Sequence, residues 1–418
     1  MAMIQKQYDM IVVGAGAAGL FAAVHGSIQG LNVLILEKND RIGKKLAITG
    51  KGRCNVTNDC SEEDFLKNVP KNPRFLYSSI YSYPPMRVME FFEEHGCPLK
   101  VERGNRVFPD SDRSADILGV FSRLLQKYKI LVLRQKVVDL MTEDGRVIGV
   151  KTNTQNHYAP CVLLCTGGAS YPLTGSTGDG YKISERVGHT VVPPTGSLVP
   201  LISNEDCAQM QGLSLRNTEL RLVDQKGKLV FKDFGEMLFT HFGISGPMAL
   251  SASAHLKENQ SYKVILDLKP GLDEQKLDAR FLRDFEKYAN RSMENALADL
   301  YPHSLIPVLL RRSDIPADQK AHSLTKEQRR ALLRLTKSFE LPVIGTRPVE
   351  EAIITRGGIS VKEIEPGTME SKKVRGLFFA GELIDCDAYT GGFNLQIAWS
   401  TAYAAAMGCV DYLKYQED

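Results

Sequence analysis

Residues 10–37, MIVVGAGAAGLFAAVHGSIQGLNVLILE, contain the pattern that decides the fold at the start of the chain. A short apolar run leads into Gly14, Gly16 and Gly19, an alanine-rich segment follows, and a second apolar run ends at Glu37. This order predicts a strand, a helix and a second strand. Gly14 permits a tight turn, Gly16 allows a pyrophosphate to approach the backbone, and Gly19 allows the helix to pack closely on the strand. The stretch therefore predicts a dinucleotide-binding β-α-β unit.

The expected contacts of the dinucleotide follow from this unit. The helix begins near Ala17 and Ala18, where unpaired N–H groups and the positive end of the helix dipole favour a phosphate. Glu37 comes eighteen residues after Gly19, at a place where a carboxylate can accept hydrogen bonds from the adenosine ribose. Lys38 follows directly and is assigned to the same site.

Two later segments favour FAD over NAD. In 157–170, HYAPCVLLCTGGAS, an apolar strand runs into three polar and glycine residues. In 377–396 a strand ends at Gly381-Glu382, and a glycine-rich turn leads to an alanine-rich helix from about Gln396. Flavoproteins of the glutathione-reductase fold class have similar segments, and the similarity implies that Glu382 contacts the ribityl chain. Further contacts with FAD are expected from Val137, Thr166, Gly167, Gly168, Gly381, Gly391, Gly392, Asn394, Leu395 and Gln396.

The polar segment 49–58, TGKGRCNVTN, follows the β-α-β unit and has no apolar periodicity. In this fold class it passes the FAD pyrophosphate on its way to the flavin ring. We therefore expect positive charge near the phosphates from Lys44, Lys45, Lys51 and Arg53. Gly50 and Gly52 would let the backbone approach the cofactor closely. Hydrogen bonds to the phosphates or the flavin are expected from Asn55, Thr57 and Asn58. Cys54 is assigned to the same set. The segment contains no histidine, so FAD is expected to bind without a covalent bond.

Composition limits the class of protein. The 418 residues, with 43% hydrophobic and 24% charged residues, are typical of a globular chain of two or three domains. The net charge of +3 excludes a polyelectrolyte built as a whole for nucleic acid. The start of the chain lacks a signal peptide pattern, no run is long enough to span a membrane, and the eight cysteines show no zinc-like grouping. We therefore predict a cytoplasmic protein without a metal site. The sequon Asn55-Val56-Thr57 is then not expected to be glycosylated, because glycosylation needs the secretory route.

Several motifs together resemble one bacterial flavoprotein family. They are TGKGRCNVTN, VFPDSDRSADIL, CTGGASYPLTGSTGDGY, LFTHFGISGP, TRGGISVKEI and the C-terminal stretch 368–400. This is the BaiN/RdsA family, which includes aminoacetone-oxidase-like, bile-acid-inducible and ribosomal-RNA dihydrouridine synthase proteins. The resemblance implies an α/β fold with a glutathione-reductase-type FAD-binding Rossmann domain, an inserted β-barrel-like domain and a small helical domain.

The pattern along the chain agrees with that layout. Short alternating strands and turns begin near residue 193, and leucine, arginine and lysine recur at helical spacing from about residue 272. The predicted division is 1–192 with 345–418 for the FAD-binding domain, 193–271 with 341–344 for the β-barrel-like insert, and 272–340 for the helical insert.

The reaction class stays open at this point. No second GxGxxG follows a strand, so NAD(P)H is expected to visit the flavin only transiently, or the substrate itself reduces the flavin. The family implies a reductase of an unsaturated bond, with uridine of 23S rRNA as one substrate. A small-molecule amine oxidase or ene-reductase is the alternative, and a flavin-holding RNA-binding or sensor protein without turnover is the alternative of another class.

Four side chains are candidate proton donors. His241 lies in the motif LFTHFGISGP and can act as a general acid. Cys54 is the rival, since the neighbouring Arg53 would favour its thiolate. Tyr171 lies beside a glycine-rich loop, and Tyr389 is in a similar position.

A basic stretch indicates a possible RNA partner. Residues 301–340 contain eight lysines and arginines against four acidic residues, a surplus larger than that of the whole chain. A surplus confined to one inserted segment is typical of a surface that contacts RNA phosphates. A solvated helix face has the same composition, because lysine and arginine are good helix formers. A monomer that binds rRNA or a small molecule is predicted.

Overall fold

The computed structural model describes residues 8–204, 206–257 and 259–415. The chain divides into two compact units, Met1–Ser197 with Val349–Asp418 and Leu198–Pro348. The first seven residues, on which the expectation of no signal peptide partly rests, lie outside the described residues. Each unit has its own hydrophobic cluster.

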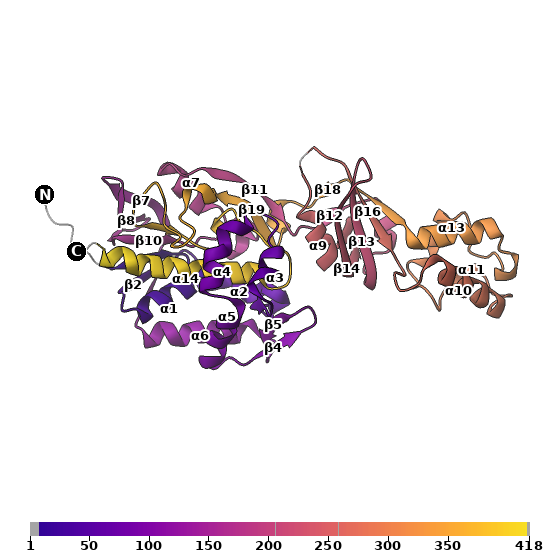
Figure 1. Cartoon of the computed structure of the whole chain (residues 1–418), viewed down its shortest axis with the longest axis horizontal. Helices are drawn as coiled ribbons and strands as arrows, with labels where there is room; N and C mark the ends of the chain where they lie inside the picture. The colour runs from indigo at the N-terminus through magenta and orange to yellow at the C-terminus, as the bar shows by residue number, and fades with distance from the viewer. Residues whose placement is uncertain (1–7, 205, 258, 416–418) are drawn as a thin grey trace. The chain divides into compact units, whose positions relative to one another are not determined.

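The first unit is built on a parallel sheet of five strands in the order β20-β10-β1-β2-β6. Each neighbouring pair is parallel, and β1 lies between β10 and β2. Figure 1 labels β2 and β10 of this sheet. The strands read as nearly continuous apolar runs because helices cover both faces of such a sheet. They span Met10–Val13 (β1), Val33–Glu37 (β2), Leu131–Arg134 (β6), Cys161–Leu164 (β10) and Leu377–Phe379 (β20).

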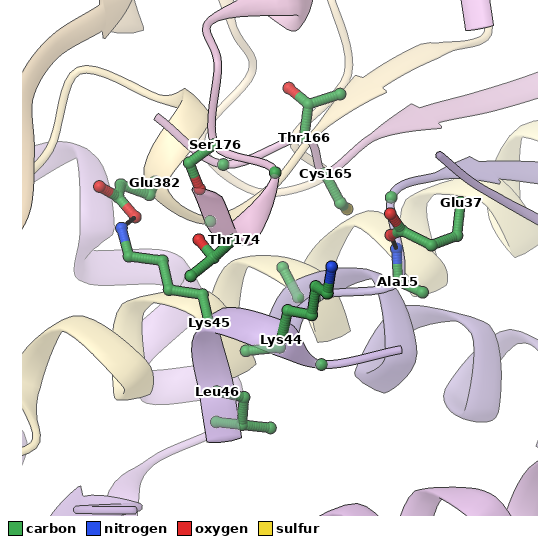
Figure 2. A pocket seen from close by; sticks show the side chains of 18 of the residues that line it. Ala15, Glu37, Lys44, Lys45, Leu46, Cys165, Thr166, Thr174, Ser176 and Glu382 are labelled. Atoms are coloured by element: carbon green, nitrogen blue, oxygen red, sulfur yellow. Dashed lines mark hydrogen bonds and ion pairs between the residues drawn. The ribbon is translucent and has the colours of Figure 1, made fainter. Parts of the chain in front are cut away.

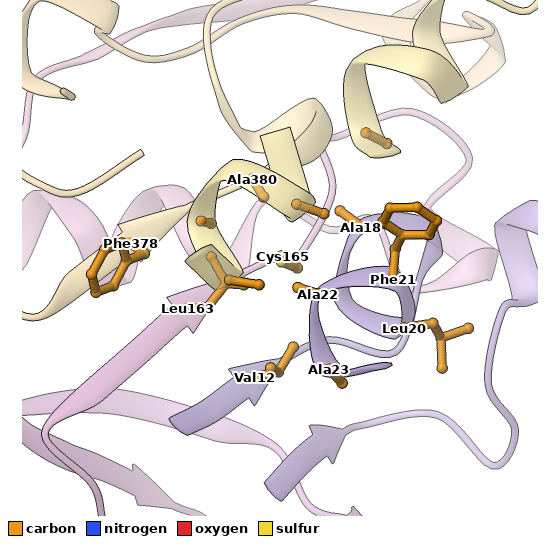
Figure 3. Packing of buried hydrophobic residues seen from close by; sticks show 14 of the residues in the cluster. Val12, Ala18, Leu20, Phe21, Ala22, Ala23, Leu163, Cys165, Phe378 and Ala380 are labelled. Carbon is orange, nitrogen blue, oxygen red and sulfur yellow. The ribbon is translucent and has the colours of Figure 1, made fainter. Parts of the chain in front are cut away.

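Two helices that are far apart in the sequence pack on this sheet. Helix α1, Ala17–Ile28, connects β1 to β2, and α14, Phe393–Lys414, is the last helix. The two helices contact each other, because both are rich in small residues that allow close approach. Figure 3 shows Phe21 and Ala22 of α1 in the same apolar cluster as Leu163 and Phe378 of the sheet. The dinucleotide-binding unit and the C-terminal segment therefore share one core.

Smaller elements complete the first unit. Two three-stranded antiparallel sheets have the orders β3-β5-β4 and β7-β8-β9, and β11 pairs with β19. These strands are Thr57–Asn58 (β3), Leu99–Glu102 (β4), Arg106–Pro109 (β5), Val137–Glu143 (β7), Arg146–Thr152 (β8), Asn156–Tyr158 (β9), Val191–Ser197 (β11) and Ile354–Ile359 (β19). The remaining helices are Lys44–Ile48 (α2), Glu62–Lys67 (α3), Tyr77–Ser82 (α4), Pro85–Glu94 (α5), Ser114–Lys127 (α6) and Asp179–Arg186 (α7).

The second unit contains an antiparallel sheet of seven strands in the order β17-β16-β13-β14-β15-β12-β18. Its two outer strands, β17 and β18, are adjacent in the sequence, since Ile344 alone separates them. One continuous segment therefore pairs with β16 at one edge and with β12 at the other, which makes the sheet barrel-like, as predicted. The strands are Leu201–Ile202 (β12), Ser214–Asp224 (β13), Leu229–Thr240 (β14), Gly243–Ser245 (β15), Tyr262–Asp267 (β16), Phe339–Val343 (β17) and Gly345–Thr346 (β18).

Helices of the second unit lie between β16 and β17 in the sequence, as the helical spacing indicates. They are Glu274–Lys287 (α10), Met293–Ala296 (α11), Ile306–Arg312 (α12) and Lys326–Lys337 (α13); α8, Asp206–Gln209, and α9, Pro247–Ser253, come earlier. Leu277 and Leu332 of the helices belong to the same hydrophobic cluster as Leu220 and Phe239 of the sheet. The boundary between a β-barrel-like insert and a helical insert therefore stays a prediction. Among the described residues, no helix is both long and apolar enough to cross a membrane.

Candidate functional site

The turn between β1 and α1 has the geometry that its three glycines predict. Gly14 has a φ of +103°, and a Cβ atom there would lie 2.6 Å from the carbonyl oxygen of Cys165. A Cβ on Gly19 would lie 1.9 Å from the carbonyl oxygen of Gly14. A Cβ on Gly16 would meet no heavy atom within 4 Å. Gly14 and Gly19 therefore serve the packing of the chain, and the open side of Gly16 is the face that a ligand can approach.

Glu37 is fixed at the end of β2 by hydrogen bonds from its own chain. The N–H of Ala15 donates to Oε2 at 2.7 Å (Figure 2), and the N–H and Nδ2 of Asn39 donate to Oε1, each at 2.8 Å. The residue is 8% exposed. Because a carboxylate offers about four lone-pair positions, these three bonds leave capacity for a hydroxyl donor.

A cleft lies in the first unit beside this turn. Its walls come from the β1–α1 turn, the end of β2, α2, the loop after β10 and the C-terminal segment. The structure thus brings together segments that are hundreds of residues apart. The predicted cofactor residues among its lining are Gly14, Gly16, Ala17, Ala18, Glu37, Lys38, Lys45, Val137, Thr166, Gly167, Gly381, Glu382, Asn394 and Leu395.

Lys45 and Glu382 form an ion pair in the wall of the cleft. The Nζ of Lys45 lies 2.6 Å from Oε2 of Glu382 and donates to the hydroxyl of Ser170, also at 2.6 Å (Figure 2). The other oxygen, Oε1, accepts from the Thr355 N–H at 2.8 Å and from the Ser170 hydroxyl at 3.0 Å. Glu382 therefore ties α2, the 170 loop and β19 together.

Several predicted contacts lie outside the lining of the cleft and have visible structural roles. A Cβ on Gly168 would lie 2.3 Å from Oγ1 of Thr355, and one on Gly392 would lie 2.2 Å from the carbonyl oxygen of Thr57. Gln396 accepts a hydrogen bond from Thr57 at 2.6 Å. The predicted residues outside the lining are Gly19, Gly52, Arg53, Cys54, Asn55, Gly168, Gly391, Gly392 and Gln396. Their contacts with FAD stay predictions.

Arg53 contacts acidic side chains of its own unit. Its guanidinium forms ion pairs with Glu102 and Asp112 and lies 4.0 Å from the centroid of the Phe108 ring. Because Asp112 belongs to the motif VFPDSDRSADIL, this pairing joins two of the sequence motifs. In this structure Arg53 anchors the polar segment 49–58, and its role toward phosphate stays a prediction.

Cys54 is completely buried, and the expectation of a favoured thiolate is wrong. Burial raises the pKa of its thiol to about 12, which the side-chain hydrogen bond with Thr49 offsets only in part. The guanidinium of the neighbouring Arg53 is engaged with Glu102 and Asp112. At neutral pH the thiol is protonated and held away from solvent.

Two of the other candidate proton donors, Tyr171 and His241, lie in different units. Tyr171 belongs to the first unit and is 37% exposed, with a left-handed φ of +53°. Its loop continues into Thr174 and Ser176, which line the cleft. His241 belongs to the second unit and is an exposed residue between β14 and β15. Tyr171 is therefore the candidate that the described structure connects to the cleft.

Sequence reasoning missed several lining residues. Asp179 forms ion pairs with Lys38 at 2.7 Å and with Lys136 at 3.5 Å. The motif GSTGDGY, which contains Asp179, was a visible signal for this part of the site. Asn39, Gly43, Gln135, Lys136, Thr174, Gly175, Ser176, Asp179, Ile353 and Ile354 line the cleft in addition to the predicted residues.

The residues of the cleft fit an FAD molecule. Helix α1 has no side-chain cap at its N-terminus, so its N–H groups there are available to a phosphate. The hydroxyl of Thr166 is buried in the lining and has no hydrogen-bond partner among the described residues. Such a group favours a polar ligand, since a buried hydroxyl without a partner is costly. The open side of Gly16 leaves room for the pyrophosphate, and the Glu37 carboxylate can accept a further hydrogen bond from a ribose hydroxyl.

The fold and this cleft define a flavin-dependent oxidoreductase with a Rossmann-type FAD-binding domain. The chain belongs to the HI0933-like family, because the family described as "HI0933-like protein Rossmann domain" matches residues 8–408. The resemblance stated from the motifs is thereby confirmed.

Two relatives match over nearly their full lengths. The 3-dehydro-bile acid delta(4,6)-reductase of Clostridium scindens is 30% identical over 96% of this chain and 98% of its own. The ribosomal RNA dihydrouridine synthase of Haemophilus influenzae is 31% identical over 96% of this chain and 98% of its own. Among solved structures, the 3-ketosteroid delta1-dehydrogenase of Sterolibacterium denitrificans has a TM-score of 0.50 at 15% identity, covering 97% of this chain and 99% of that chain. This last likeness concerns the fold alone.

Proposed function

We propose that this chain takes electrons from NAD(P)H and adds two hydrogen atoms across a carbon–carbon double bond conjugated to a carbonyl group. One observation carries the proposal. Two relatives match this chain over nearly their full lengths, and their names give different substrates but the same type of reaction. A delta(4,6)-reductase saturates a double bond of a bile acid, and formation of dihydrouridine saturates the ring double bond of uridine. We assign this shared reaction to the present chain. Its substrate is either a uridine base in RNA or a small enone.

The residues of the cleft would hold FAD in a defined orientation. The N–H groups at the start of α1 and the open side of Gly16 would bind the pyrophosphate, and Glu37 would bind the adenosine ribose. Asn394 and Leu395, in the first turn of α14, would lie toward the flavin end. Bound FAD, once reduced by NAD(P)H, would supply the hydride, since cofactors carry the redox chemistry and the protein supplies binding and orientation.

Saturation of the double bond also requires a proton. We assign the donor role to the Tyr171 hydroxyl, because Tyr171 is partly exposed and its loop enters the lining of the cleft. The neighbouring Ser170 is held by Lys45 and Glu382, which fixes the start of this loop. A general acid at a fixed position typically contributes about 10²–10⁴ in rate.

Anaerobic rapid-mixing spectroscopy with the FAD-loaded protein tests the proposal. NADH or NADPH should bleach the flavin, and a uridine-containing RNA or a conjugated steroid dienone should restore its colour under nitrogen. Mass spectrometry should then find a product that has gained two hydrogen atoms. Bleaching by an amine, with recovery only on admission of oxygen, would assign the chain to the oxidases instead.

A further inference from the structure

Three basic side chains form a stripe along the exposed face of α13. Lys326, Arg330 and Arg334 follow each other at intervals of four residues, and all three are exposed. At a rise of about 1.5 Å per residue this spacing places them on one face, roughly 6 Å apart along the helix axis. Within the described ranges, none of the three forms an ion pair with a carboxylate. We call Lys326, Arg330 and Arg334 the α13 stripe.

The neighbouring helix α10, which packs against α13 in the same unit (Figure 1), has the opposite arrangement. Its four basic residues all have acidic partners: Lys276 pairs with Asp273, Arg280 and Arg283 with Asp284, and Lys287 with Asp299. Its composition is balanced at four basic and four acidic residues, whereas α13 has five basic residues and one acidic residue. The unpaired charge is therefore specific to α13.

The other basic residues of the region serve the fold. Arg329 of α13 pairs with Asp278 at 2.7 Å, and Lys337 pairs with Asp267. Arg311 and Arg312 both pair with Asp206. On α13, the three residues of the stripe are therefore the basic residues that remain without an acidic partner among the described residues.

The helix that carries the stripe is held firmly. A capping box formed by Thr325 and Gln328 closes its N-terminus, and Leu332, Leu333 and Thr336 are buried on its inner face. Like charges one turn apart repel each other by a few tenths of a kcal/mol per pair, so the stripe does not stabilise the free protein. An anionic ligand with regularly repeated charges would remove that repulsion.

We propose that the α13 stripe binds the phosphate backbone of RNA. The inference rests on the proposed function and narrows its substrate to a uridine-containing RNA. A membrane surface fits less well, because an interfacial helix needs an apolar face for the lipid and the apolar face of α13 is buried in the unit. Phosphate contacts of this kind add affinity without sequence specificity, so the choice of base would come from the cleft.

The test uses the full-length, FAD-loaded protein and a fluorescently labelled, uridine-rich RNA hairpin. The triple variant Lys326→Gln, Arg330→Gln and Arg334→Gln keeps good helix formers in place and removes only the stripe. The matched control, Lys276→Gln, Arg283→Gln and Lys287→Gln, removes the same number of charges from the exposed side of α10. Arg329 is left unchanged because its loss would break the ion pair with Asp278.

The stripe variant should lose about 100-fold in RNA affinity near 0.1 M salt, and its slope of log affinity against log salt should fall by about two. Each phosphate contact contributes roughly 0.7 to this slope, so the loss of three contacts gives a change of about two. The control should bind like the wild type, and flavin bleaching by NAD(P)H should be unchanged in both variants. Equal affinities for wild type and stripe variant, or an equal loss in the control, would overturn the proposal. Stripe-dependent binding to anionic phospholipid vesicles without binding to RNA would assign the stripe to a membrane.

This experiment separates the two proposals. If the protein binds RNA through the stripe but saturates no double bond, the proposed reaction is contradicted and the proposed RNA-binding surface stands. A protein that reduces a free dienone and binds no RNA would leave the reaction intact and contradict the surface.

Discussion

The cleft of the first unit and the exposed face of α13 in the second unit use basic residues in opposite ways. In the cleft, Lys45 is paired with Glu382 and Lys38 with Asp179, which are acids from distant segments of the sequence. On α13 of the second unit, three cations point into solvent without a partner among the described residues. A paired cation fixes the position of neighbouring groups, and an unpaired, exposed one is available to an external anion. This difference supports the two proposals made above, a reaction in the cleft of the first unit and RNA binding by the α13 stripe of the second.

The strongest test of that division concerns the proton donor. Tyr171→Phe should lower the rate of product formation by about 10²–10⁴ while flavin content and flavin bleaching by NAD(P)H stay normal. His241→Gln, in the second unit, should leave the rate within a few-fold of the wild type. Single-turnover reoxidation of the reduced flavin measures both. The reverse result would show that the second unit contributes to catalysis and would break the comparison.

Substitution of Gly16 should separate cofactor binding from folding. Gly16→Val places its side chain in space that the chain leaves open, so the fold should persist while the pyrophosphate is displaced. Loss of one or two charge-assisted hydrogen bonds of about 1.5–3 kcal/mol each predicts a loss of FAD affinity of about 100-fold or more. RNA binding by the α13 stripe should persist. Gly14→Val is the contrasting variant, because its Cβ would clash with Cys165 and should lower the melting temperature.

Glu37→Ala should have a smaller effect on the same property. Loss of the ribose contact, worth roughly 1.5–3 kcal/mol, predicts FAD retention weaker by about one to two orders of magnitude. Equilibrium dialysis against free FAD gives the measurement, and Glu37→Gln serves as the size-matched control. Unchanged affinity in both variants would show that another group holds the ribose.

Cys54 offers the mildest probe, one that leaves the protein intact. With a pKa of about 12, only roughly a thousandth of this thiol is ionised at pH 9, whereas an ordinary cysteine is mostly thiolate there. Because the thiolate is the nucleophile, Cys54 should resist iodoacetamide in the folded protein up to pH 9 and react after unfolding. Peptide mass spectrometry identifies the labelled site. Rapid labelling of native Cys54 at pH 7 would show that its thiol is reactive in the folded protein.

The sequence by itself determined the nucleotide-binding part of the fold. Strand, glycine turn, helix, strand and terminal Glu37 follow one another within residues 10–37, so their geometry depends on local propensity and periodicity. The C-terminal return to the cofactor, at Gly381 and Glu382, could be predicted because its motif resembles a known fold class. The helix after it begins at Phe393, three residues before the predicted start, since element boundaries depend on capping geometry.

Only the tertiary structure decided which polar side chains serve the cleft and which serve the fold. Lys45 and Glu382 are 337 residues apart, and no local pattern encodes a pair at that separation. The sequence predicted Arg53 as a phosphate ligand, and only the structure shows that it forms ion pairs with Glu102 and Asp112. Cys54 looked like a reactive thiol beside an arginine, but burial raised its pKa. The physical reason is the same in each case: charge and ionisation depend on distance and solvent exposure, which arise only when distant segments pack together.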